Sequence, residues 1–471
     1  MAKKLDFDNR PDFDWSKPLK SPDIKEVAEQ NHGWQGDRNE QYRIGVGIKE
    51  KVQRGEALTP KERGMALVLG ITGDRVVSFT HHGDWALRHY GLTTSEARKN
   101  PTKHAQVYVD FYNDFGVDLI TACASDCAIL ETEALGMPVK TYENGVDQSG
   151  GTIIKDEKDV WKLREYIETT DLRKAGRMPE RMEMFRELRR LSNDTAFLLP
   201  QVGSPFLLAW FLAGYGTLVK WMRKKPHLLH LFLDVCKLAC FKFIDAWKEV
   251  GVHAVVESVS SSWMPHLHEW QAQEFIIPYT AQVTGYAWPF PCFGYAWGAP
   301  YAIGTDTRKY DRKNMGSEDE WIRWQMRDIM NTNSPVFYNL ASDCDMPPGN
   351  NLSRYRDLAL YFKRAYKVGI HGEELLSGTP EFITRKMVTW LLEMYPCEGG
   401  ACIRANFIDI NTSPENILAW TNALKEYGTF PMDRSKMEAY LKDHPGPTIC
   451  YELKGLEGKL LKKAQEKNLV E

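Results

Sequence analysis

From about residue 60 onward, short apolar runs alternate with amphipathic segments. The strand-like runs are residues 74–79, 117–123, 196–202, 253–259, 335–341, 366–370 and 401–408, with a weaker candidate at 151–155. Strands separated by helices pair in parallel, because parallel strands need crossover connections. Seven clear strands and one weak strand predict an α/β fold of the closed (β/α)8 TIM barrel type. A doubly wound open sheet is the alternative, but no G-x-G-x-x-G motif follows the first strand.

The ends of several helices are marked by capping residues. Ser413 and Pro414 supply an N-cap and a proline at the first helical position, and Gly428 follows the last apolar position of the same helix. Thr379 and Pro380 open another helix in the same way. These signals confine the intervening strands to short intervals.

The chain divides into three parts. Residues 1–60 are charged and are expected to form an N-terminal arm with a lead-in helix. Residues 61–430 hold the predicted barrel, and residues 431–471 are expected to form a C-terminal tail packed on it. Two stretches are longer than the loops of a minimal barrel require, near residues 141–195 and 280–316. Long insertions of this kind usually serve as lids or binding loops.

Composition narrows the range of functions. The net charge of −3 and the lack of a basic run give nucleic-acid binding no electrostatic support. No apolar stretch approaches the roughly 20 residues of a membrane span, and the polar N-terminus has no signal-peptide core. Nine scattered cysteines favour a reducing compartment, so we expect a cytoplasmic protein.

Five stretches, taken in order, resemble the uroporphyrinogen decarboxylase superfamily over roughly residues 60–430: residues 62–77, 110–140, 202–234, 377–395 and 412–428. An R-Q-A-G-R-Y motif, typical of the decarboxylases themselves, is missing. A tetrapyrrole with many carboxylates would need such cations. The resemblance therefore implies the methyltransferase branch, whose members exchange a methyl group with a corrinoid (cobalamin) carried on a separate protein.

The resemblance also implies where the chemistry lies, because barrel enzymes place it at the carboxyl ends of the strands. The candidate catalytic residues are Glu257, Asp343, His266 and Asn339. The candidate substrate-binding residues are His81, His82, Trp288, Phe290, Tyr295, Trp297, Arg404 and Asn406. The chain has no D-x-H-x-x-G cobalamin motif, so the expected partner is a corrinoid-binding protein.

Zinc is a weaker expectation. Many methyltransferases of this branch hold zinc by a His-x-Cys pair and a further Cys, but Asn339 and Ala341 fill the first two positions here and Asn406 falls near the third. A different set of ligands would come from Glu257, His266, Cys292 and Cys344, and a site without metal is the remaining alternative.

Without a zinc-bound thiol, the resemblance favours a small, uncharged methyl donor such as a methoxylated aromatic compound. Its leaving oxygen would need a general acid, for which Glu257, Asp343 and His266 are candidates. Alternatively, Glu257 bonds only to backbone amides. The rival functions are a decarboxylase or lyase of the same barrel and a barrel that binds a corrinoid or substrate without turnover.

Residues 285–301 hold seven aromatic side chains among prolines and glycines. Such a composition excludes a long regular element. We interpret the segment either as a loop that covers the barrel mouth or as a contact between copies of the chain in a homo-oligomer.

Overall fold

The computed structural model of the chain describes residues 38–448, apart from 81–83, 121–127, 146, 259–270, 272–273, 288–289, 296–365, 371, 397–400 and 406–407. The expected lead-in helix near residues 23–30 and the strand expected at 335–341 lie outside these residues. Within the described part, no helix is long and apolar enough to cross a membrane.

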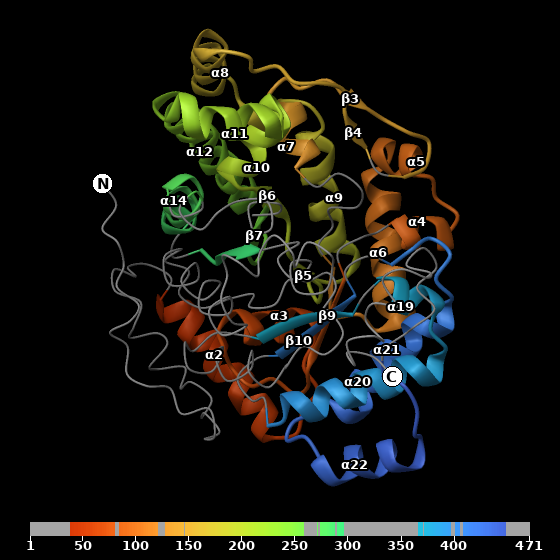
Figure 1. The fold of residues 1–471 in the computed structure, drawn as a ribbon. Helices are drawn as coiled ribbons and strands as arrows, with labels where there is room; N and C mark the ends of the chain where they lie inside the picture. The colour runs from red at the N-terminus through yellow and green to blue at the C-terminus, as the bar shows by residue number, and fades with distance from the viewer. Residues whose placement is uncertain are drawn as a thin grey trace.

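A parallel barrel sheet runs through the described residues, and the predicted TIM barrel is confirmed (Figure 1). Its strands are β1 (Val77–Thr80), β2 (Leu119–Ile120), β5 (Phe197–Leu198), β6 (Gln201–Gly203), β7 (Val255–Ser258), β8 (Cys292–Tyr295), β9 (Tyr366–Ile370) and β10 (Ala401–Ala405). They pair in the orders β5-β2-β1-β10-β9 and β6-β7-β8, and every one of these pairs is parallel. β1 lies beside β10, so the first and last strands meet as barrel closure requires.

β5 and β6 are two halves of one barrel strand. Only Leu199 and Pro200 separate them, and a proline has no N–H to donate to a neighbouring strand. The Pro200 carbonyl still accepts a hydrogen bond of 2.9 Å from Val256 N. The two sheets are therefore continuous across this point.

Two expectations about the strands need correction. Residues 151–155 do not form a strand; the Ile153 and Ile154 N–H groups both donate to the Leu212 carbonyl of a helix. A barrel strand forms instead at Cys292–Tyr295, within the stretch expected to be an irregular loop. The sequence PCFGY is too short and too rich in glycine and proline to show a strand period.

The helices carry the chain back between strands and cover the barrel. They are α2 (Arg38–Gln53), α3 (Pro60–Val68), α4 (Asp84–His89), α5 (Thr94–Lys99), α6 (Pro101–Phe115), α7 (Ile129–Ala134), α8 (Glu157–Thr169), η1 (Leu172–Lys174), α9 (Met178–Leu191), α10 (Pro205–Ala213), α11 (Tyr215–Lys224), α12 (Pro226–Val250), α14 (Ile277–Ala287), α19 (Gly372–Ser377), α20 (Pro380–Met394), α21 (Pro414–Tyr427) and α22 (Arg434–Asp443). Ser413 and Thr379 cap α21 and α20 as predicted, each accepting a backbone N–H bond.

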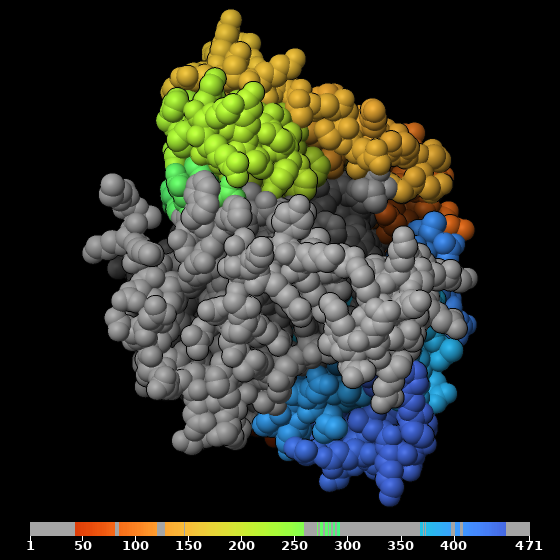
Figure 2. All heavy atoms as spheres, viewed as in Figure 1, coloured from red at the N-terminus to blue at the C-terminus, as the bar shows by residue number. Residues whose placement is uncertain are grey.

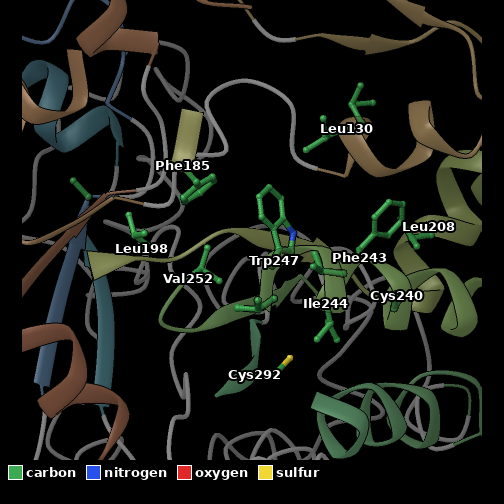
Figure 3. Close-up of a cluster of buried hydrophobic side chains, with 14 of the residues drawn as sticks. Leu130, Phe185, Leu198, Leu208, Cys240, Phe243, Ile244, Trp247, Val252 and Cys292 are labelled. Atoms are coloured by element: carbon green, nitrogen blue, oxygen red, sulfur yellow. The ribbon is translucent and has the colours of Figure 1, made fainter. Parts of the chain in front are cut away.

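The two faces of the barrel strands contact different cores. Phe79, Leu119 and Val256 pack with α3, which closes the amino end of the barrel interior. Val255 and Cys292 pack instead with the surrounding helices. Figure 3 shows part of this outer core. Successive side chains of a strand alternate between its two faces. The core in which a strand residue packs therefore shows whether it faces the barrel interior or the surrounding helices.

Residues 139–149 form a hairpin of β3 (Val139–Lys140) and β4 (Gln148–Ser149). Buried Asp147 anchors it by ion pairs with Arg98 and Arg177, the second at 2.6 Å. At the other end of the chain, Arg385 of α20 donates to the carbonyls of His444 and Pro447. These contacts fix the first half of the 141–195 insertion and the segment after α22 onto the body of the protein.

Candidate functional site

The carboxyl half of the barrel interior carries three buried polar residues, Gln201, Ser258 and Arg404. The strand register places them on the inner face, because Gln201 lies beside Val256, and Arg404 lies beside Phe79. Ser258 is two residues beyond Val256 and therefore points the same way. Below them the inner face is apolar, with Val77, Leu119, Phe197, Leu199, Ala254 and Cys402. Polarity thus appears where barrel enzymes bind their substrates.

Arg404 is the charged group of this cluster. Its side chain has no exposed surface, and its guanidinium carbon lies 4.8 Å from the centroid of the Phe79 ring. The alternation in ACIRA explains the position: Cys402 belongs to the inner core, whereas Ile403 belongs to the outer core. A guanidinium stacked on an aromatic face gains cation–π energy, and its planar N–H donors have a geometry that suits an oxygen ligand.

The backbone near this cluster is tightly bonded. Ser204 N donates to the Ser258 carbonyl at 2.9 Å, and the Ser204 hydroxyl caps α10 by accepting from Leu207 N. The ends of β6 and β7 are therefore held together just beside Gln201 and Ser258. Sequence reasoning missed Gln201, although Phe197, Leu199 and Gln201 follow one alternating face in AFLLPQV.

Glu257 lies in β7 near the carboxyl end, as expected, but its side chain faces the helices rather than the barrel interior. It is fully buried and two residues beyond Val255, which packs in the outer core. Its charge also acts on the thiols of Cys240 in α12 and Cys292 in β8, both members of that core. A shift of one residue changes the face of a strand, so this placement argues against the expectation that Glu257 points at the substrate.

A second buried carboxylate lies close by, on α7. Glu131 is 2% exposed, and its Oε1 accepts a hydrogen bond of 3.2 Å from Gly203 N. The Cys240 thiol donates to the carbonyl of the same Gly203 at 3.2 Å. Together these contacts hold the end of β6 from its outer side. Glu131 and Cys240 thereby position the strand that carries Gln201.

Burial raises the pKa of the Cys240 and Cys292 thiols well above their ordinary value, and the Glu257 charge adds to both shifts. Both thiols also pack among the surrounding helices rather than in the barrel interior. Among the described residues, no group of three or more His, Cys, Asp or Glu side chains could hold a metal ion. Cys292 and Glu257 therefore do not fit a zinc site at the barrel mouth.

Two of the expected aromatic residues fall at opposite ends of β8. Phe290 precedes the strand, and Lys248 of α12 lies 5.8 Å from its ring, so Phe290 belongs to the amino end of the barrel. The backbone of Tyr295 pairs with Ser258 at the carboxyl end. The other predicted site residues lie outside the described part of the chain: His81, His82, His266, Trp288, Trp297, Asn339, Asp343, Cys344 and Asn406.

A parallel barrel with its polar inner residues at the carboxyl ends of the strands is the architecture of the TIM-barrel class. The family profile described as "Uroporphyrinogen decarboxylase (URO-D)" matches residues 75–287. Over these residues the chain is similar to the uroporphyrinogen decarboxylase family, and the resemblance noted from the sequence is confirmed.

Two curated relatives match the chain. Both are uroporphyrinogen decarboxylases, one from Anaeromyxobacter dehalogenans (strain 2CP-C) with 24% identity and one from Anaeromyxobacter sp. (strain Fw109-5) with 23% identity. Each match covers 196 residues, 40% of this chain and 54% of the relative. The chain thus spans about half the length of these relatives.

A solved structure matches over a longer part. It is a methyltransferase from Methanosarcina mazei, with a TM-score of 0.64 and 15% identity. The match covers 79% of this chain and 99% of that one. At this identity the likeness concerns the fold, which the two chains share over nearly the whole methyltransferase.

Proposed function

We propose that the protein is a corrinoid-dependent methyltransferase. It would move a methyl group between a small, uncharged donor, such as a methoxylated aromatic compound, and cobalamin on a separate corrinoid-binding protein. The observation that carries the proposal is the shared barrel, which covers 99% of the Methanosarcina mazei methyltransferase. The missing arginine-rich motif of the decarboxylases supports the same choice.

In this reaction the inner polar residues would bind the methyl donor. Arg404, stacked on Phe79, presents N–H donors that can bind an oxygen of the donor molecule, and Gln201 and Ser258 add hydrogen-bonding groups nearby. The apolar layer beneath them excludes water from the same volume. Cobalamin, when presented by its partner, supplies the nucleophilic cobalt. Asp343 and His266 remain the proposed sources of the proton for the leaving oxygen.

The test is methyl transfer from a panel of methoxylated aromatic compounds to free, chemically reduced cobalamin, followed by absorbance and mass spectrometry. Arg404→Met should lower kcat/KM by about 10²-fold, because a charge-assisted bond to the substrate is lost. Arg385→Met is the matched control, since Arg385 is also buried but bonds the C-terminal segment. Equal losses in the two variants would show that Arg404 is only structural. No transfer by the wild type with any donor would refute the proposed activity.

Decarboxylation by the same barrel is the second candidate, and Arg404 is the observation that favours it. A buried guanidinium in the barrel interior suits a carboxylate as well as a neutral oxygen. Carbon dioxide release from uroporphyrinogen, without methyl transfer to cobalamin, would decide for this alternative. Binding of a donor or of cobalamin without either reaction would indicate a binding protein.

A further inference from the structure

Four exposed cations gather where α11 ends and α12 begins: Lys220, Arg223, Lys224 and Lys225. We call them the cationic rim. The opposite face of α11 is buried through Leu218, Trp221 and Met222, so the helix is fixed and its charged face points to solvent. Among the described residues, none of the four rim side chains forms an ion pair or a hydrogen bond. In Figure 2 the α10–α12 segment forms an open yellow-green surface.

The rim lies on the side of the barrel mouth. α12 ends at Val250, shortly before β7 begins, so it runs antiparallel to the strands. Cys240 of α12 lies level with the carboxyl end of β6, because its thiol bonds the Gly203 carbonyl at 3.2 Å. Lys225, the N-cap of α12, lies about four turns from Cys240 toward the N-terminus of the helix, or roughly 22 Å at 1.5 Å per residue. The rim therefore stands well beyond the carboxyl ends of β6 and β7, and Figure 1 shows α11 and α12 on the side of these strands away from β5.

Arg223 and Lys224 lie in the last turn of α11, where cations suit the helix dipole, but Lys225 is placed less favourably. Lys225 is the N-cap of α12, makes no side-chain cap bond, and no acidic residue occupies the first turn. A cation at a helix N-terminus opposes the helix dipole. Some cations on other helices are paired, as Arg164 is with Glu168 at 2.8 Å and Lys237 is with Asp234 at 2.6 Å. The rim thus concentrates four unpaired positive charges within residues 220–225.

We propose that the cationic rim docks an acidic face of the protein that carries the corrinoid. This inference rests on the proposed function, which requires a second protein at the barrel mouth. The whole chain has a net charge of −3, so the rim is a local positive feature on an acidic protein. Such a patch attracts an acidic partner and orients it, and the benefit appears mainly in the association rate.

The experiment compares Lys224→Glu/Lys225→Glu with the wild type. The matched control is Lys442→Glu, which reverses an exposed lysine in the last turn of α22. α22 follows Thr429, whose backbone bridges to Arg75 at the amino end of the barrel. The probe is a recombinant corrinoid-binding protein loaded with cobalamin, and association is followed by stopped-flow fluorescence at low and high salt.

We expect the double variant to associate about tenfold more slowly at low salt, with a smaller change in dissociation. The difference should shrink at high salt, where charges are screened. Lys442→Glu should behave as the wild type, and methyl transfer to free cobalamin should be unchanged in all three proteins. Unchanged association of the double variant with the corrinoid-binding protein would overturn the docking site. Binding of the three proteins to anionic phosphatidylserine vesicles is measured as well. If the double variant loses only vesicle binding, the docking site is also overturned. A wild type that transfers no methyl group to free cobalamin would instead count against the proposed function.

Discussion

Asp118 is expected to be a main stabilising residue at the amino end of the barrel. It precedes β2, is 1% exposed, and its carboxylate lies between two guanidinium groups. Arg75 Nη2 lies 2.6 Å and Arg63 Nη1 lies 2.9 Å from Oδ1. Oδ2 accepts from both the backbone N and the hydroxyl of Ser78, each at 2.9 Å. The perturbation is Asp118→Ala, which removes all four bonds.

The size of the effect follows from what the variant leaves behind. Arg63 keeps Asp74, with two bonds of 2.7 Å, and remains neutralised. Arg75, only 9% exposed, keeps a bond to the Val76 carbonyl but loses its carboxylate. Breaking a buried ion pair on one side costs about 3–5 kcal/mol. Ser78→Ala removes the hydroxyl that donates to Asp118 Oδ2 and accepts from Asp118 N, but it leaves both ion pairs and should cost only about 1–2 kcal/mol.

Urea unfolding followed by circular dichroism and tryptophan fluorescence measures these differences as midpoint shifts at constant slope. Glu438→Ala is the control, because it breaks an exposed pair with Arg434 and should cost about 0–1 kcal/mol. The urea midpoint of Asp118→Ala should lie clearly below those of Ser78→Ala and Glu438→Ala. The methyl-transfer rate per folded Asp118→Ala molecule should be unchanged. A midpoint shift for Asp118→Ala no larger than that for Glu438→Ala would refute the reasoning.

Two further predictions concern His253 and Glu257. Burial lowers the pKa of His253 to about 4, and its Nδ1 accepts a bond of 2.9 Å from Leu198 N. The unfolded residue takes up its proton near pH 6.5 while the folded one stays neutral, so stability should fall between pH 6.5 and 4 by about 2–3 kcal/mol. His253→Gln should flatten the curve of unfolding free energy against pH between 6.5 and 4. An unchanged curve would show that other groups cause the fall in stability. Glu257→Gln should keep the methyl-transfer rate within about tenfold, because its carboxyl faces the helices; a loss beyond about 10²-fold would restore it as the general acid.

Much of the fold followed from local signals in the sequence. The alternation of apolar runs and amphipathic segments predicted β1, β2, β7, β9 and β10, and Ser413 and Thr379 predicted the starts of α21 and α20. The weak candidate at 151–155 failed because two adjacent isoleucines suit a segment packed along a helix as well as a strand. β8 was missed because a four-residue strand that contains glycine has almost no period to detect.

The candidate site was harder to predict, because the face of a residue matters as much as its strand. In HAVVESV, Ala254, Val255 and Val256 are apolar in succession and Glu257 and Ser258 are polar in succession, so the pattern gives no inner or outer assignment. Only the register with β6 and β8 shows that Val256 is inner and Val255 outer. Arg404 was placed correctly at the end of a late strand, but its position over Phe79 depends on the closure of β1 against β10.

These faces also separate two roles for buried polar groups in this barrel. Glu131 and Cys240 approach Gly203 from the helix side, where they can hold the end of β6 but cannot reach a ligand in the barrel interior. Arg404, Gln201 and Ser258 share the inner face, where a ligand would displace water and meet their donors in a low-dielectric space. A proton donor for a leaving oxygen must stand within hydrogen-bond reach of that oxygen. It must therefore come from the inner face or from the loops beyond the strands, and an outer carboxylate such as Glu257 can influence the reaction only through the strand that it supports.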